Sequence, residues 1–231
     1  MYYIQRNGQT NSDINLYVKE RPRIPSPEYK YDKQEIPGRD GELYTEYETV
    51  EDITIPVILK FHCNPSKWQD MFRKAKRWLL SKIDNMLILS DDINYFYKVK
   101  HTTINESERE VKEFGEFTVN FICEGCQYSI EGQKEITASN LYNDGYITHP
   151  IYKVGGEGEC TLTVNGKTVK ANVGQNLTID TDRMLAYRTD GTMQNTSLTG
   201  DYEDLYLIEG ENKVSITSGF VLKIIPNWRY L

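Results

Sequence analysis

The chain has 231 residues and a formal net charge of −7 at pH 7; 39% of its residues are hydrophobic and 12% are aromatic. This aromatic content excludes a disordered chain. The negative charge divides almost evenly between residues 1–130 and residues 131–231, which argues against a basic face that binds nucleic acid. The first residues contain no apolar stretch of signal-peptide length, so we expect a soluble protein made in the cytoplasm.

A proline-rich arm is predicted at about residues 21–44. The segment 21–27 contains three prolines, which remove backbone donors and favour extended geometry in the preceding residues. A turn of proline, glycine and an Arg–Asp pair follows it. We predict that these turn residues shape a subunit contact, with the arginine as a candidate for a cross-subunit ion pair; the alternative is an exposed turn whose ion pair contributes little. The turn residues are Pro37, Gly38, Arg39, Asp40 and Gly41.

Three period-two patterns predict strands that form the walls of one β-sandwich or barrel within residues 1–130. Each pattern places apolar or aromatic side chains on one face. The three sets are Ile53, Ile55, Val57, Leu59 and Phe61; Ile93, Tyr95, Tyr97 and Val99; and Phe117, Val119, Phe121 and Cys123.

One helix is predicted at about residues 66–83, between the first two strands. Ser66 is the expected N-cap, with Gln69 as its capping-box partner. Apolar residues recur at helical spacing from Trp68 to Ile83 and should pack on the sheet. The other face carries a basic stripe, for which we favour a solvated surface over a nucleic-acid or lipid patch. The stripe comprises Arg73, Lys74, Lys76 and Arg77.

A second, all-β domain is predicted over residues 131–231, because regular alternation lapses near residue 130. Asn165–Gly166 is the preferred pair for a two-residue hairpin loop and joins two apolar strands. A second hairpin turn is expected at residues 209–212. Further short strands are expected around Leu177 and Ile179, Leu205 and Leu207, Val214 and Ile216, and Val221 to Ile225. The pattern favours a small antiparallel sandwich.

The four cysteines are expected to be reduced thiols. Cys123 and Cys126 have the spacing of zinc ligands, but no second Cys or His pair completes a four-ligand shell, even with His62 beside Cys63. Cys160 has no such neighbour. We therefore expect no metal, no cofactor and no disulfide framework.

No catalytic motif is recognisable in the sequence, and we expect a protein that is not an enzyme. The three histidines, at positions 62, 101 and 149, adjoin no nucleophile in the sequence. Acidic pairs in predicted loops leave a cell-wall glycosidase as a weaker alternative. These pairs are Glu157 with Glu159, Asp180 with Asp182, and Asp201 with Asp204.

Several motifs together resemble the distal tail proteins of long-tailed bacteriophages. They are the Pro-Gly-Arg-Asp-Gly turn, the strand from Asp52 to Phe61, the helix with Trp68 and Trp78, and the segments 143–150 and 225–229. The resemblance implies an N-terminal β-sandwich or split-barrel domain (residues 1–130) and a C-terminal galectin-like sandwich (residues 131–231). It also implies a structural hub at the virion tail tip or baseplate, assembled in the host cytoplasm.

The resemblance further implies a homohexameric ring around a channel for DNA, built from the N-terminal domains. Its expected partners are the tail tube, tape-measure and tail-tip or tail-associated lysin proteins, with receptor-binding or adaptor proteins on the C-terminal domain. DNA should pass without specific binding, and no membrane insertion is expected.

A carbohydrate-binding module that recognises the host cell wall is the alternative function, since a galectin-like domain can carry an aromatic platform. We expect these aromatic residues to line a protein contact more readily than a sugar site. The candidates are Tyr187, Tyr202, Tyr206 and Trp228.

Overall fold

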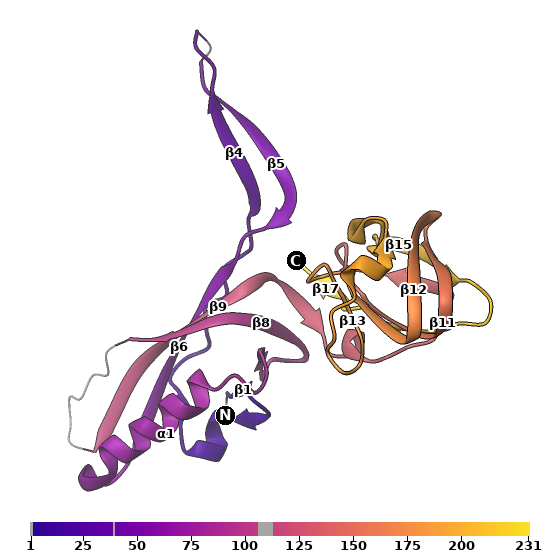
Figure 1. Cartoon of the computed structure of the whole chain (residues 1–231). Coiled ribbons are helices and arrows are strands. Elements are labelled where there is room, and N and C mark those ends of the chain that lie inside the picture. Colours follow the sequence, from indigo (N-terminus) through magenta and orange to yellow (C-terminus); the bar gives the residue numbers. More distant parts are fainter. Residues whose placement is uncertain (1, 39, 106–112) are drawn as a thin grey trace. The chain divides into compact units, whose positions relative to one another are not determined.

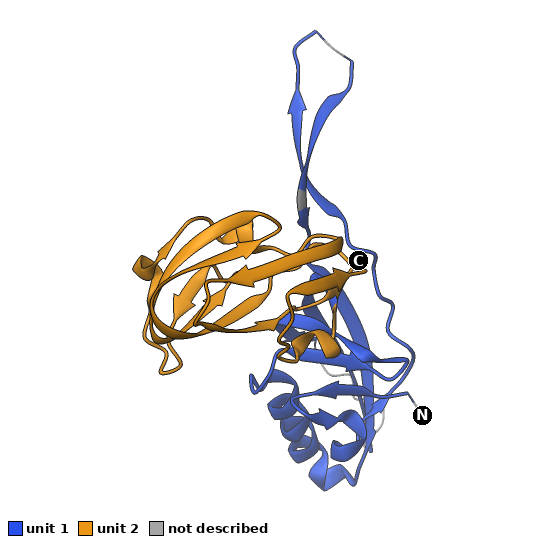
Figure 2. Cartoon of the chain, turned by 90° about the vertical axis from the view of Figure 1, so that its right-hand side faces the viewer, with its two compact units in different colours: residues 1–127, 231 blue, residues 128–230 orange. Residues whose placement is uncertain are grey.

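The structure is a computed structural model that describes residues 2–38, 40–105 and 113–231 (Figure 1). Its backbone divides into two compact units, residues 1–127 with residue 231 and residues 128–230 (Figure 2). Among the described residues there is one α-helix, α1 (Trp68–Leu80), and the other long elements are strands. The mainly-β class with a single helix and a projecting hairpin is therefore confirmed.

Unit 1 is built around one antiparallel sheet with the order β2-β1-β7-β8-β9-β6-β3. Both strands at its ends are only two residues long. The bounds are β1 (Ile4–Arg6), β2 (Gln9–Thr10), β3 (Tyr17–Val18), β6 (Ile53–His62), β7 (Met86–Leu89), β8 (Asp92–Ile104) and β9 (Phe114–Ser129). A short 3₁₀ helix, Asn11–Ile14, links β2 to β3.

The centre of this sheet follows the predicted alternation. Along β6 every second residue from Ile53 to Phe61 is buried, and β9 buries Phe117, Val119, Phe121 and Cys123. The two strands pair in register from Ile53 opposite Cys123 to His62 opposite Phe114. A period-two pattern puts all of these side chains on one face, where they form the core under α1.

The pattern predicted for β8 is wrong at its first residue. Ile93 is 56% exposed, whereas Phe96, expected on the other face, is buried together with Tyr97 and Val99. The register of β7 with β8 shifts between Leu87 and Leu89. Such an irregularity changes which side chains face the core, and a period count along one strand does not reveal it.

The helix differs from its prediction at both ends. Asn64, not Ser66, provides the cap, because its Oδ1 accepts a hydrogen bond from the Ser66 backbone N–H ahead of the 3₁₀ turn Pro65–Lys67. The helix stops at Leu80, and Ile83, expected on the buried face, is 79% exposed. The Asn7 side-chain amide donates to the carbonyls of Trp78 and Ser81, and so satisfies groups at the helix end from outside the helix.

The predicted arm forms a separate two-stranded sheet of β4 (Tyr29–Glu35) and β5 (Glu42–Val50). It reaches farther along the chain than the predicted residues 21–44. In Figure 1 it extends away from the sheet of its own unit. Every residue of β4 is exposed.

Unit 2 contains a seven-stranded antiparallel sheet with the order β10-β15-β11-β12-β13, to which β14 and β16 also pair. Its core includes Tyr152, Leu162, Val169, Ile179 and Leu207. The strands are β10 (Asn140–Asn143), β11 (Ile151–Val164), β12 (Lys167–Asp180), β13 (Leu185–Tyr187), β14 (Leu198–Thr199), β15 (Gly210–Ile216), β16 (Val221–Ile225) and β17 (Arg229–Tyr230), with β17 paired to β9. Short 3₁₀ helices are Glu131–Gln133, Asn195–Ser197 and Tyr202–Leu205.

The long hairpin β11–β12 turns at Asn165–Gly166, as predicted. Both residues have positive φ, 51° and 86°, and Val164 pairs with Lys167 across them. This backbone is the one that asparagine followed by glycine adopts at low cost.

Three details of unit 2 differ from the sequence interpretation. Leu205 and Leu207 are buried in a 3₁₀ helix and the loop after it, not in a strand. The expected turn at residues 209–212 is already strand β15, which begins at Gly210. Strand β9 runs past the end of its predicted pattern at Cys123 to Ser129, and its alternation of burial breaks at Gly125 and Cys126, which are both buried. For β9 and β15, pairing with other strands overrides the local turn signal.

Candidate functional site: the exposed hairpin

The base of the hairpin is fixed to unit 1 by close backbone packing. The Glu51 N–H donates to the Glu28 carbonyl at 2.8 Å, which closes the two strands at their base. Gly125 of β9 lies directly beneath them. A Cβ at this position would come within 2.3 Å of the Glu51 carbonyl oxygen and 3.1 Å of Pro27, so only glycine fits the present geometry.

The tip contains the turn that the sequence indicated. Pro37 and Gly38 form a turn, and Gly38 and Gly41 have φ values of 83° and 82°, where a side chain would be strained. Asp40 is exposed. Arg39, the predicted cross-subunit partner, lies outside the described residues.

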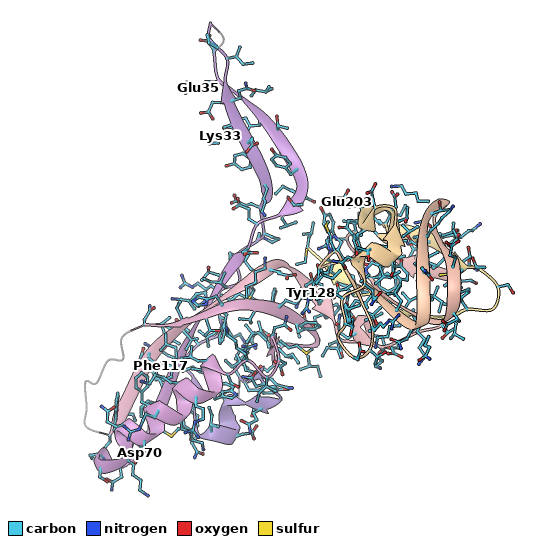
Figure 3. All side chains as sticks on the ribbon, in the orientation of Figure 1. Lys33, Glu35, Asp70, Phe117, Tyr128 and Glu203 are labelled. Carbon is cyan, nitrogen blue, oxygen red and sulfur yellow. The ribbon has the colours of Figure 1, made fainter. Side chains whose placement is uncertain are left out.

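One face of the hairpin combines tyrosines with charged groups. The rings of Tyr31 and Tyr44 lie 5.5 Å apart, and the Lys33 ammonium lies 5.6 Å and 5.3 Å from their centres. Lys33 also lies 3.7 Å from Glu42. Tyr44, then Tyr31 and Glu42, raise the pKa of Lys33, which stays charged. Figure 3 shows Lys33 and Glu35 extending from β4.

The opposite face is held by a hydrogen bond from the Tyr47 hydroxyl to the Asp32 carboxylate, which raises the pKa of Tyr47. Large apolar groups remain exposed on both strands and at the tip. These are Tyr29, Tyr31, Ile36, Leu43, Tyr44 and Tyr47, each 38–54% exposed. The predicted contact lay in the turn and did not include these strand residues, although Tyr29, Tyr31 and Lys33 already alternate along β4.

The four aromatic candidates of unit 2 lie in four different settings. Tyr187 is on β13, Tyr202 packs partly on the core, and Trp228 also packs on the core, next to Gly132. Tyr206 stacks on His149 with ring centres 4.2 Å apart. No ring contact joins two of the four among the described residues.

His149 is the centre of a polar cluster that the sequence interpretation did not identify. Its Nδ1 lies 3.1 Å from Asp182 Oδ1, and its Nε2 lies 3.1 Å from the Arg229 guanidinium. Arg229 also donates to the Ile147 carbonyl. Because Arg229 can only donate, the neutral imidazole carries its proton on Nδ1 toward Asp182 and accepts on Nε2. The lone pair that a general base would use is thus engaged by the guanidinium.

The cysteines are free, and only Cys63 is not buried. Burial raises the pKa of the Cys123 thiol to about 12, and it raises that of Cys160. In the described part of the chain, no three His, Cys, Asp or Glu side chains gather in an arrangement suited to a metal ion. Nor does any described helix have the length and apolar character needed to cross a bilayer.

Comparison with known proteins agrees with this architecture. Residues 10–123 match the family model described as the phage tail protein RIFT-related domain. The whole chain superposes on all of bacteriophage SPP1 Dit (gp 19.1), described as a paradigm of the hub adsorption apparatus in phages that infect Gram-positive hosts, with a TM-score of 0.72 and 17% identity. A search of curated proteins by sequence finds no match. The first part of the chain therefore matches a domain family of phage tail proteins, and the chain as a whole has the fold of SPP1 Dit.

Proposed function

We propose that the protein is the hub of a tail tip or baseplate, where six copies form a ring around a channel for DNA. Unit 1 forms the ring between the tail tube and the tip proteins, and unit 2 binds receptor-binding or adaptor proteins. The observation that carries this proposal is the hairpin β4–β5, whose apolar side chains remain exposed in the single chain.

The hairpin's energetics favour a partner. A two-stranded sheet with no third strand and no covering element is at best marginally stable in water. Here every residue of β4 and the described side chains of β5 from Glu42 to Thr49 are exposed, with four tyrosines among them. Burial of these rings against a neighbour would add roughly 25 cal/mol for each Å² of apolar surface removed from water. A neighbouring subunit is therefore the simplest explanation for this sequence in a folded protein.

The sheet of unit 1 also offers strand edges. β7 pairs with β8 only as far as Lys98, although β8 continues to Ile104. At the other side, β3 pairs only with Leu59 and Lys60 of the ten-residue β6. Two different edges of one subunit suit a head-to-tail interface, and a head-to-tail interface closes into a ring when the rotation allows it.

Unit 2 carries exposed apolar side chains that suit a protein partner. Tyr142 is 70% exposed and Ile208 is 50% exposed. Asn143, next to Tyr142, donates to the Ile208 carbonyl at 3.3 Å, so the backbone segments that carry these two residues are neighbours. Aromatic residues are enriched at protein interfaces, which supports the proposed docking role of a galectin-like unit.

The hairpin's role is tested by replacing residues 30–49 with Asn-Gly. This loop joins Tyr29 and Val50, which already pair directly, so unit 1 keeps its base contacts. We expect the wild-type chain to form a ring and the variant to run as a monomer in size exclusion with light scattering. Fluorescence of Trp68 and Trp78, both in unit 1, serves as the control for folding. A folded variant that still forms the ring would overturn the role of the hairpin.

The carbohydrate-binding alternative predicts a monomer that binds host cell-wall glycans on an array. The described rings of Tyr187, Tyr202, Tyr206 and Trp228 make no contact with one another, so they form no shared platform that would support sugar binding. The carbohydrate-binding alternative therefore stays a prediction. A glycosidase would require turnover of a cell-wall sugar that is lost when one of the paired carboxylates is changed.

A further inference from the structure

The outer face of α1 carries positive charge that its own unit does not neutralise. Lys74 and Arg77 are exposed on this face and form no ion pair with a described residue, whereas Arg73 pairs with Asp70. Lys74 and Arg77 are three residues apart and therefore lie side by side on the helix, where like charges destabilise it. An external anion would relieve this repulsion.

Apolar surface follows these cations at the end of the helix. Leu80 is 50% exposed, and Ile83, just beyond the helix, is 79% exposed. The outer face thus combines two unpaired cations with an apolar end, which is a suitable surface for a partner that carries both carboxylates and aromatic rings.

The hairpin has the complementary composition. Glu35 and Glu42 are direct partners across β4 and β5, and like charges at such positions destabilise a strand pair. Of these two glutamates, Lys33 forms an ion pair with Glu42 only. Glu46, opposite Tyr31, adds a third carboxylate to the same face. Tyr31 and Tyr44 complete this face, which we call the acidic face of the hairpin: Tyr31, Lys33, Glu35, Glu42, Tyr44 and Glu46.

We propose that the acidic face of the hairpin of one copy docks along the outer face of α1 of a second copy. Glu35 and Glu42 then pair with Lys74 and Arg77, and the tyrosines cover the apolar end of the helix. The proposal rests on the ring proposed above and names the surface that receives the hairpin. The hairpin of the same chain does not occupy its own α1, because every residue of β4 is exposed.

The two surfaces match in length. A helix of 13 residues is about 20 Å long, and a strand of seven residues spans about 23 Å. With Glu35, at one end of β4, placed at Lys74 and Arg77, the strand is long enough for its tyrosines to reach the C-terminal end of the helix. Because the hairpin and the helix are different parts of one chain, each copy gives one surface and receives the other, as a head-to-tail ring requires.

Charge reversal on each surface tests the docking. The hairpin variant carries Glu35→Lys and Glu42→Lys, and the helix variant carries Lys74→Glu and Arg77→Glu. All four side chains are exposed, so neither variant should unfold. We expect each variant alone to need a roughly tenfold higher protein concentration for assembly, because attraction becomes repulsion. Glu157→Lys with Glu159→Lys, at two exposed positions of β11, gives the same change in net charge as the hairpin variant and should assemble normally.

An equimolar mixture of the two variants provides the decisive arm of the experiment. The hairpin variant has a basic hairpin, which can dock on the acidic helix of the helix variant. The helix variant keeps its acidic hairpin, which can dock on the basic helix of the hairpin variant. We expect rings of alternating copies in size exclusion with light scattering. A salt-dependent loss of assembly in each variant alone, with recovery on mixing, supports the proposal.

The other outcomes separate this proposal from the proposed function. If the wild-type chain is monomeric at every concentration, the ring itself is wrong. If the wild-type chain forms a ring and both variants do so equally well, the docking is wrong and the ring stands. If the hairpin variant fails to assemble and the mixture does not recover, the hairpin binds a surface other than α1, which also overturns the docking.

Discussion

At the scale of single residues, Gly125 decides how closely the hairpin base can approach the main sheet. Its backbone φ is not positive, so glycine is required here for space and not for conformation. The nearest atom to an added Cβ is a backbone oxygen, that of Glu51. A rotamer change cannot move this atom, so the backbone at Glu51 would have to shift.

Gly125→Ala should therefore destabilise the protein by about 1–3 kcal/mol, the usual cost of overpacking. Thermal unfolding followed by circular dichroism measures the effect. Gly155→Ala is the matched control: it also lies in a strand, and its added Cβ would meet Val221 only at an ordinary 3.9 Å. Equal unfolding temperatures of the two variants would show that the hairpin base is not tightly packed.

At the scale of elements, one carboxylate connects three neighbouring segments of the unit 1 sheet. Glu116 of β9 lies 2.5 Å from the Lys19 ammonium, just after β3, and 2.8 Å from that of Lys60 on β6. Hydrogen bonds from Lys19 and Lys60 lower the pKa of Glu116 below its ordinary value of 4.5. The paired state therefore stabilises the fold at a pH above that value, and this contribution is lost as the pH falls through the lowered pKa.

Glu116→Gln should cost about 1 kcal/mol at neutral pH, because both ion pairs are partly exposed. The difference from wild type should vanish at a pH well below 4.5. Urea unfolding followed by tryptophan fluorescence measures this difference in the free energy of unfolding. A Trp228→Phe background is used, because the remaining Trp68 and Trp78 report on unit 1 alone. Glu159→Gln, at an exposed position of unit 2, should show no such pH-dependent difference. A Glu116→Gln effect that is the same at both pH values would exclude the ion pairs as its cause.

Most elements could be predicted from the sequence because their patterns are local. The alternation from Ile53 to Phe61 and the Asn165–Gly166 turn give a strand and a hairpin by their own chemistry. The end of α1 could not be predicted, since Asn7, about seventy residues away in the sequence, satisfies its last carbonyls. The exposed position of Ile93 likewise depends on the register of β8 with its neighbour.

The candidate site was predicted only in part, for a related reason. Proline and glycine mark a turn in any sequence, so the tip of the arm was recognisable. The C-terminal end of the arm was placed too early, at residue 44 and not at Val50, because the residues of β5 follow the turn with no distinctive composition. Which glutamates oppose each other is set by the register of β4 with β5, and the sequence alone does not specify it.

At the scale of the whole molecule, the single chain leaves apolar surface and strand edges uncovered in unit 1. Unit 1 has an exposed, tyrosine-rich hairpin and two strands that run beyond their neighbours. The weakly acidic chain has no excess of basic charge of the kind that binds nucleic acid. These features suit a ring whose subunits complete one another around a channel.

Native mass spectrometry of the full-length chain tests this central claim most directly. The account predicts a closed species of six chains whose abundance falls as the ionic strength rises, because charged surfaces contribute to the contact. A chain that stays monomeric at high concentration and low salt would contradict it.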